Sequence, residues 1–210
     1  MVDIWPFFGT RPYNQDAKTL IAPSTDHLSI ENIEIFRKNN YWNYLKILNP
    51  VGQLKEKDSL LEAKSHFNEM KNNNVIKKDS LLHFYIYQIE LDGHVQLGFL
   101  SLASIKDFEK RIIKPHEKIY ESRKIERADQ MMNLSTQIGP IYVSYPQENN
   151  IHDLLSSQIL KSPSYDFESF DHSIHRLWCV NDIKFIEKLK SLMKNINAIY
   201  IADGHHRMGA

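Results

Sequence analysis

The chain has 210 residues, of which 42% are apolar and 25% are charged, and its 26 Lys and Arg residues balance 26 Asp and Glu residues. These proportions are those of a folded globular protein, and the zero net charge argues against a chain whose main task is to coat nucleic acid or an anionic membrane. No apolar run approaches 18 residues, so the sequence predicts neither a transmembrane helix nor a membrane partner.

The first third of the chain is predicted to be irregular before it becomes helical. Residues 1–29 contain three prolines, which interrupt regular structure, so we expect short strands or loops there. Ser29 is a favoured helix-capping residue, and apolar side chains at helical spacing follow it, so a helix is predicted over Ile30–Asn39. The same spacing predicts a second helix over Ser59–Lys71.

A β-hairpin is the clearest local prediction. Leu82–Leu91 is rich in aromatic and β-branched residues, and Asp92-Gly93 is a pair that suits a type I′ turn, so Val95–Ala103 is expected to return as the second strand. The next stretch, residues 106–127, carries eight Lys or Arg and five Asp or Glu residues. We expect either a solvated helix face or a rim that attracts a phosphate-bearing ligand.

The second half of the chain alternates strands with helices. Its predicted elements are a strand over Ile138–Tyr145 that Pro140 places at an edge or a strand start, a helix over Asn150–Leu160, a loop over Ser162–Phe170, a strand over Arg176–Val180, a helix from a cap at Asn181 to Lys194, and a strand over Ala198–Ala202. This order and the hairpin predict an α/β or α+β domain with a mixed sheet and flanking helices. No linker divides residues 1–210, so we expect one domain. The single cysteine excludes an intramolecular disulfide and favours a cytoplasmic location.

The strongest chemical motif is Asp203-Gly204-His205-His206-Arg207, directly after the last apolar strand. A glycine turn that opens a helix presents free backbone N–H groups, Arg207 can bind phosphate oxygens through two hydrogen bonds, and either histidine can donate to an anion. Asp203 could hold Mg²⁺ because hard cations prefer carboxylate oxygen. The alternative is a polar turn with two surface histidines.

A second motif is Lys114-Pro115-His116-Glu117-Lys118. Glu117 could act as a general base, or it is only a carboxylate at a helix start. His116 is a further candidate contact. Arg127 is another, because it shares a predicted helix face with Arg123; both could bind phosphate or pair with nearby glutamates. A zinc hydrolase is disfavoured, since no H-E-x-x-H spacing occurs.

Several short segments carry a family resemblance in their order and spacing: Ala22–Ser29, Lys114–Lys118, Ile138–Tyr142, His175–Trp178 and Tyr200–Arg207. With these, the sequence resembles domain-of-unknown-function family 1015 over essentially its whole length. It departs from the family pattern at Ser24-Thr25, Ile119 and Met208. Family members are about twice as long, so the resemblance implies an N-terminal part of a longer protein. The turn after Gly204 would then fray for lack of a helix to complete it.

The last motif also resembles a signature of the ParB/sulfiredoxin-like superfamily, which includes kinases of free serine, partition proteins that bind CTP, and sulfiredoxins. That resemblance implies a ParB-like strand–loop–helix, phosphate contacts for Gly204, His205, His206 and Arg207, and a metal or hydroxyl ligand in Asp203.

Three hypotheses follow for the function of the chain. The first is a phosphotransferase that uses ATP or ADP and Mg²⁺ to phosphorylate a small hydroxy acid or amino acid, with Glu117 and Asp203 as catalytic residues. The second is a nucleotide-binding regulatory module of the partition-protein type. The third is an inactive truncated fragment. The zero net charge and the lack of a recognisable helix-turn-helix make a nucleic-acid partner unexpected.

Overall fold

A computed structural model describes residues 1–13, 16–21, 29–48 and 56–210; most of the Ala22–Ser29 family segment lies outside them. The chain forms two units, each built from separate stretches of sequence. Unit 1 contains Met1–Gly9, Asp79–Lys124 and Pro140–Ala210, and unit 2 contains Thr10–Lys78 and Ile125–Gly139. Because each unit is assembled from interleaved stretches, no linker separates them along the sequence.

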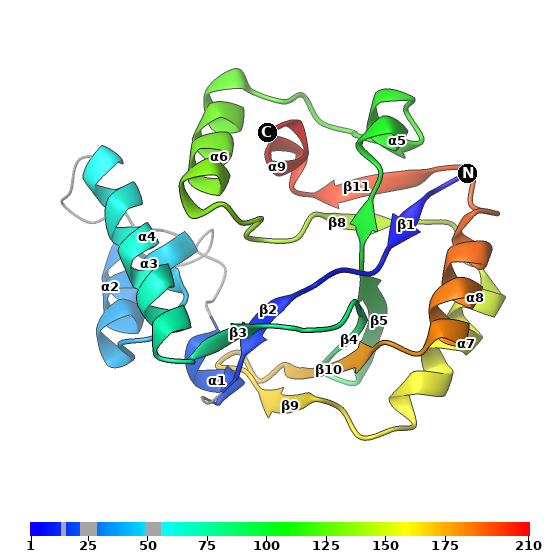
Figure 1. Cartoon of the computed structure of the whole chain (residues 1–210), viewed down its shortest axis with the longest axis horizontal. Coiled ribbons are helices and arrows are strands. Elements are labelled where there is room, and N and C mark those ends of the chain that lie inside the picture. Colours follow the sequence, from blue (N-terminus) through cyan, green and yellow to red (C-terminus); the bar gives the residue numbers. More distant parts are fainter. Residues whose placement is uncertain (14–15, 22–28, 49–55) are drawn as a thin grey trace. The chain divides into compact units, whose positions relative to one another are not determined.

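The larger sheet of unit 1 has the order β5-β4-β10-β9 and is antiparallel throughout (Figure 1). Its strands are β4 (Phe84–Leu91), β5 (His94–Leu100), β9 (Tyr165–Glu168) and β10 (Ile174–Val180). The predicted hairpin is confirmed as β4 and β5. Asp92 and Gly93 between them have φ angles of 50° and 77°, the positive values that a type I′ turn requires.

The second sheet of unit 1 is mixed. β11 (Ile199–Asp203) lies between β7 (Ile113–Lys114), which is parallel to it, and β8 (Tyr142–Ser144), which is antiparallel. A separate pair joins β1 (Ile4–Trp5) to β6 (Leu102–Ala103). The predicted mixed α/β class, with a mixed sheet, flanking helices and a hairpin, is therefore confirmed.

The helices of unit 1 cover its apolar core. α7 (Asn149–Ile159) and α8 (Ile183–Met193) pack against each other, and both were predicted within two residues of their observed ends. Apolar side chains of both helices join those of the strands in one buried cluster, which includes Phe84, Ile86, Ile113, Ile151, Leu155, Leu189, Ile199 and Ile201. Burying such side chains stabilises a fold by about 1.5–3 kcal/mol each.

The Tyr85 hydroxyl joins the two places where the chain leaves unit 1 and returns to it, Gly9 and Asp79. Tyr85 Oη accepts a hydrogen bond from the Gly9 N–H at 2.7 Å and donates one to Asp79 Oδ2 at 2.7 Å. The Asp79 N–H in turn donates to the Gly9 carbonyl at 2.8 Å. Burial and the Asp79 hydrogen bond raise the pKa of Tyr85, so its hydroxyl stays protonated.

Unit 2 is mainly helical. It contains α1 (Ala17–Leu20), α2 (Ile30–Asn39), α3 (Leu45–Leu48), α4 (Glu56–Asn72), most of α6 (Glu121–Leu134), and the antiparallel pair of β2 (Thr10–Pro12) with β3 (Ile76–Lys78). α2 has its predicted bounds, and Ser29 Oγ accepts the Asn32 N–H as its cap. The buried cluster includes Ile47, Phe67 and Met70.

The charged stretch 106–127, for which a solvated helix face was one expectation, contains α5 (Ile105–Glu109), β7 and, after an extended stretch with Pro115, the start of α6. Two local predictions are wrong. The predicted loop Ser162–Phe170 contains β9, a short edge strand. The cap of α8 is Asp182 rather than Asn181, since Asp182 Oδ1 accepts the Phe185 N–H at 2.8 Å.

Two further predictions near the second sheet also need correction. The strand predicted over Ile138–Tyr145 is shorter, because β8 begins only after Pro140, although it does lie at an edge. The residues after Gly204 do not fray but form a short helix, α9 (His205–Gly209), so β11, Gly204 and α9 make a strand–turn–helix. Among the described residues, no helix combines the length and the apolar character needed to cross a membrane.

Candidate active site

The two polar motifs meet because the strands that precede them are parallel neighbours. Ile199 pairs with Ile113 and Tyr200 with Lys114. β7 ends there, whereas β11 continues beside β8 to Asp203, so both motifs follow the carboxyl ends of parallel strands, where ligands of α/β sheets commonly bind. The segment Pro115–Glu117 consequently runs beside the end of β11 and the start of α9.

His116 is fixed by two hydrogen bonds to this neighbouring segment. Its Nδ1 lies 2.7 Å from the carbonyl oxygen of Ile201, and its backbone N–H donates to Nε2 of His205 at 3.3 Å. The two imidazole rings meet edge to face, with centroids 4.4 Å apart. Since Nδ1 must donate to the carbonyl, Nε2 is the free nitrogen of a neutral His116.

Glu117 lies between the two imidazoles. Its Oε1 is 3.6 Å from His116 Nε2, and its Oε2 is 3.7 Å from His205 Nδ1. The side chain of His205 is 4% exposed, whereas those of His116 and Glu117 are 58% and 62% exposed. Because Nε2 of His205 accepts the His116 N–H, the proton of neutral His205 is on Nδ1 and faces Glu117.

The turn after β11 has the conformation that its glycine allows. Gly204 has a φ of +94°, and a Cβ atom added there would lie 2.8 Å from Nη2 of Arg207. Arg207 forms an ion pair with Oδ2 of Asp203, so a Mg²⁺ ion at this carboxylate would compete with Arg207 for that oxygen. The fit is reasonable, because Mg²⁺ binds through one or two carboxylates, substrate phosphates and water.

Two polar atoms in α9 are buried without a hydrogen-bond partner in the described part of the chain. They are Nδ1 of His206 and Nε of Arg207. The ring of His206 lies near that of Tyr120, at 5.8 Å between centroids. A buried polar atom that lacks a partner is destabilising, so these two atoms would gain from a ligand that supplies one.

The comparison with protein families agrees with the resemblance in the motifs. A family model described as "Protein of unknown function (DUF1015)" matches residues 4–210. The chain belongs to the DUF1015 family. No curated protein and no solved structure matches it. Both motifs of the site lie inside the DUF1015 match, but that description assigns no activity, so the chemistry has to be argued from the geometry.

In this DUF1015 chain, Arg127, a predicted phosphate contact, already has a hydrogen-bond partner within the protein. Arg127 belongs to unit 2, where its guanidinium donates to Oε1 of Gln130 at 3.1 Å. The amide of Gln130 then donates to the carbonyls of Ile47 and Leu48. These contacts support unit 2, and a phosphate contact for Arg127 stays a prediction.

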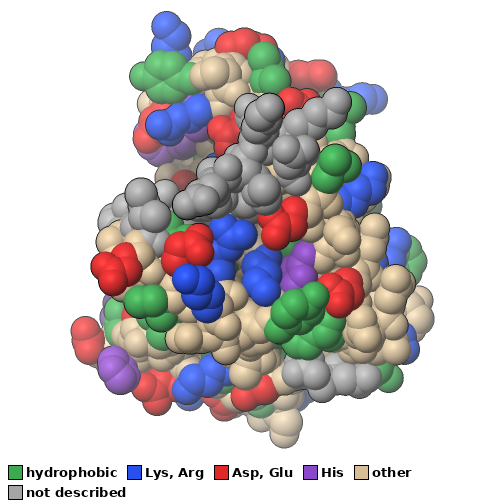
Figure 2. Space-filling model, turned by 90° about the vertical axis from the view of Figure 1, so that its left-hand side faces the viewer, with side chains coloured by type: hydrophobic (Ala, Val, Ile, Leu, Met, Phe, Trp, Pro, Cys, Tyr) green, Lys and Arg blue, Asp and Glu red, His purple; other side chains and the backbone are tan. Residues whose placement is uncertain are grey.

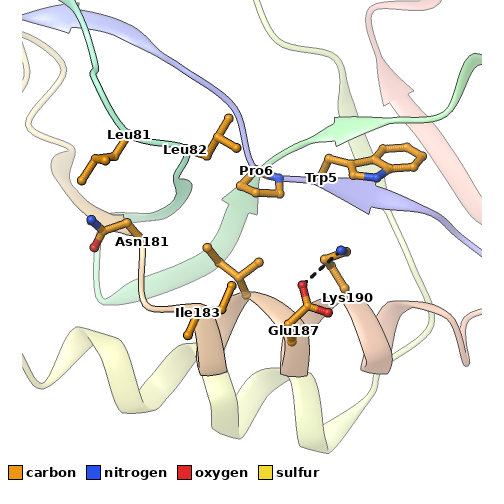
Figure 3. A pocket seen from close by; sticks show the side chains of 9 residues that line it. Trp5, Pro6, Leu81, Leu82, Asn181, Ile183, Glu187 and Lys190 are labelled. Carbon is orange, nitrogen blue, oxygen red and sulfur yellow. Dashed lines mark hydrogen bonds and ion pairs between the residues drawn. The ribbon is translucent and has the colours of Figure 1, made fainter.

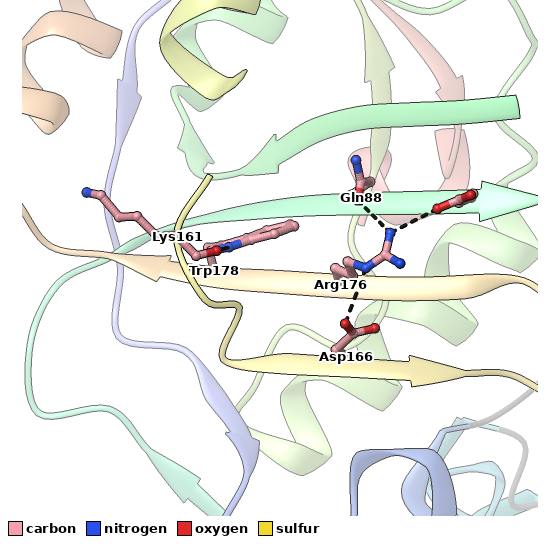
Figure 4. A network of polar contacts seen from close by, with 6 residues as sticks. Gln88, Lys161, Asp166, Arg176 and Trp178 are labelled. Carbon is pink, nitrogen blue, oxygen red and sulfur yellow. Dashed lines mark hydrogen bonds and ion pairs between the residues drawn. The ribbon is translucent and has the colours of Figure 1, made fainter. Parts of the chain in front are cut away.

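The resemblance segment His175–Trp178 lies in β10 and carries polar contacts that the sequence did not predict. Figure 4 shows the guanidinium of Arg176 reaching across the sheet to Gln88 on one side and Asp166 on the other. Arg176 also bonds Glu90 at 2.9 Å, and the indole of Trp178 donates to the Lys161 carbonyl. These contacts join three strands and a loop, so they support the sheet.

His175 is the centre of a second hydrogen-bonded chain. Its Nδ1 lies 2.6 Å from the Tyr87 hydroxyl, and its Nε2 lies 2.7 Å from Oγ of Ser173. The Ser173 hydroxyl also bonds Asp171. Burial lowers the pKa of His175 and raises that of Tyr87, so both are neutral at pH 7. Ser173 is 3% exposed, which makes it a turn-stabilising residue rather than an accessible nucleophile.

A shallow cavity of about 420 Å³ lies elsewhere in unit 1 (Figure 3). It is mostly apolar, and its lining residues include Trp5, Pro6, Leu81, Leu82, Ile183 and Ile186. None of the predicted site residues lines it. On the face shown in Figure 2, acidic and basic side chains are interspersed, so the zero net charge does not conceal a large patch of one sign there.

Proposed function

We propose that this DUF1015 chain is a nucleotide-dependent phosphotransferase that acts on a small hydroxylated metabolite. The observation that supports it is the meeting of two motifs at the carboxyl edge of parallel strands β7 and β11. There a carboxylate, Glu117, lies within 4 Å of two imidazoles and close in the fold to a glycine turn that carries Arg207.

The donor phosphates are assigned to the turn Gly204–Arg207. Gly204 adopts a positive φ, and the Arg207 guanidinium and His206 can donate to phosphate oxygens. A phosphate contact for the buried His205 stays a prediction, because its Nε2 accepts the His116 N–H and its Nδ1 faces Glu117. Asp203 would hold Mg²⁺, which supplies charge neutralisation for the transferred phosphoryl group. Phosphoryl transfer depends mainly on positioning and on charge stabilisation, and these side chains are suited to both tasks.

The acceptor hydroxyl is assigned to the side of Glu117. A carboxylate there can orient a hydroxyl group, and the buried His205 restrains the position of Glu117 through its Nδ1. The predicted role of Glu117 as general base remains a prediction. A hydroxy acid or a hydroxylated amino acid would bring its own carboxylate, for which a protonated His116 or His206 is a suitable partner.

The test is phosphorus NMR of the chain with Mg²⁺, ATP or ADP, and a panel of hydroxy acids and hydroxylated amino acids that includes L-serine. We expect a new phosphomonoester signal that Glu117→Gln and Asp203→Ala both lose. Glu121→Gln is the matched control, because Glu121 is exposed and pairs only with Lys124 among the described residues.

Absence of any product would refute the proposal. If nucleotide still binds, the regulatory module of the partition-protein type becomes the better hypothesis. If nucleotide does not bind either, the assignment of the Gly204–Arg207 turn is wrong, as it would be for an inactive fragment.

A further inference from the structure

His116 and Glu117 face each other through two groups that both accept hydrogen bonds when His116 is neutral. His116 uses Nδ1 to donate to the Ile201 carbonyl, so its Nε2 presents a lone pair toward Oε1 of Glu117 at 3.6 Å. A lone pair and a carboxylate repel each other weakly at this distance in water, and a positive charge between them would make the contact attractive. That charge is either a proton on His116 or a metal ion.

The surroundings favour a metal ion because His116 is held from behind and a second imidazole, that of His205, lies beside Glu117. Ligating histidines usually donate their second nitrogen to a carbonyl or carboxylate, and ligating carboxylates are themselves hydrogen-bonded. His116 has the Ile201 carbonyl in this role, and Nδ1 of the buried His205 lies 3.7 Å from Oε2 of Glu117, an ion-pair distance that is longer than a hydrogen bond. Ligand atoms of all three residues lie within 4.8 Å of one another.

The separation also suits a metal. Two ligands bound at about 2.1 Å each, at angles of 90–110°, lie roughly 3.0–3.5 Å apart. The His116–Glu117 distance of 3.6 Å needs only a small closure, and the more than half exposed side chain of Glu117 can make it.

We infer that His116 Nε2 and Glu117 bind a divalent transition-metal ion, with His205 as the positioning residue of Glu117. One imidazole and one carboxylate form a mixed donor set, which favours ions such as Mn²⁺ or Zn²⁺ over Mg²⁺. Two protein ligands leave the other coordination positions open for water, a hydroxyl or phosphate oxygens. This inference deepens the proposed function, and it adds a metal position distinct from the Mg²⁺ position proposed at Asp203.

A second His–Glu pair in the chain provides a matched control. Nδ1 of His172 and Oε1 of Glu168 lie 2.7 Å apart, but both side chains are exposed, and among the described residues neither contacts a buried imidazole. If a simple pair were enough to bind metal, this one would bind as well as His116 and Glu117. The inference predicts that it does not contribute.

The experiment is a titration with MnCl₂ alone, in which the electron paramagnetic resonance signal of free Mn²⁺ reports binding. We expect one principal site in the unaltered chain, weakened about tenfold or more in His116→Ala and in Glu117→Gln. His172→Ala should bind as the unaltered chain does. His205→Leu should weaken binding, and His205→Asn, which retains a donor near the position of Nδ1, should restore most of it.

The inference is overturned if the chain binds no Mn²⁺, or if His116→Ala and Glu117→Gln bind as well as the unaltered chain. Because no substrate is used, the result is separate from that of the transfer assay. Mn²⁺ binding without phosphoryl transfer would refute the proposed function alone. Transfer that His116→Ala leaves intact, together with no Mn²⁺ binding, would refute the metal site alone.

Discussion

Replacing Gly204 by alanine should destabilise the protein in two separable ways. Its φ of +94° belongs to the left-handed region, where a residue with a Cβ atom loses about 1–2 kcal/mol. The new Cβ would also meet the Arg207 guanidinium at 2.8 Å and displace it from Asp203, which adds up to about 1 kcal/mol for an exposed ion pair. Gly204→Ala should therefore lower the free energy of unfolding by about 1–3 kcal/mol.

Gly93 is the matched control for the first of these effects. It has a φ of +77°, and no atom lies within 4 Å of an added Cβ, so Gly93→Ala measures the backbone strain alone. In an Arg207→Ala background the second effect disappears, and Gly204→Ala should then cost about as much as Gly93→Ala. The double-mutant cycle isolates that difference.

The assay is urea unfolding of Gly204→Ala, Gly93→Ala, Arg207→Ala and the double variant of Gly204 and Arg207. The sign of the change in the free energy of unfolding is decisive. Where the backbone can accommodate it, Gly→Ala stabilises a protein by about 0.4–1 kcal/mol, because it restricts the unfolded chain. A more stable Gly204→Ala would therefore refute the left-handed turn. An equal cost of Gly204→Ala with and without Arg207 would refute the contact with the guanidinium.

Three further outcomes can be checked by the same unfolding assay. Asp182→Ala should lower stability by about 1 kcal/mol through loss of the α8 cap, while Asn181→Ala stays within about 0.5 kcal/mol; the reverse order would contradict the assigned cap. Burial lowers the pKa of His175, so the unfolded chain takes up a proton first and the free energy of unfolding should fall as the pH drops through about 6.5. His175→Asn should show a smaller fall in stability between about pH 7 and pH 5. An unchanged dependence of stability on pH would exclude His175 as its source. Tyr85→Phe removes the hydrogen bonds of its hydroxyl to Gly9, Asp79 and Phe7 and should cost about 1–3 kcal/mol, whereas a neutral result would mean that water replaces them.

Elements with strong local signals could be predicted from the sequence. The hairpin turn at Asp92-Gly93 and the cap at Ser29 depend on residues within a few positions of each other, and both are confirmed. β3 and β9 were not predicted, because strands of three and four residues are too short to show an alternating pattern. Their formation depends on pairing with a distant strand.

The candidate site likewise combines residues that the sequence reveals with contacts that depend on the pairing of distant strands. Glu117 and His205 could each be selected from their motifs, and the family resemblance that those motifs carry is confirmed. Their approach to each other depends on the parallel pairing of β7 with β11, for which two short strands give no local signal. The bond from His116 to the Ile201 carbonyl follows from that pairing and was equally out of reach.

The strand order of unit 1 has a consequence for the growing polypeptide. In both of its larger sheets a middle strand comes late in synthesis: β10 separates β4 from β9, and β11 separates β7 from β8. Until these strands emerge from the ribosome, β4, β7 and β8 present unpaired backbone edges, which are prone to intermolecular pairing. Nascent chains that lack β10 and β11 should therefore depend on chaperones, and folding should be slow for a protein of this size.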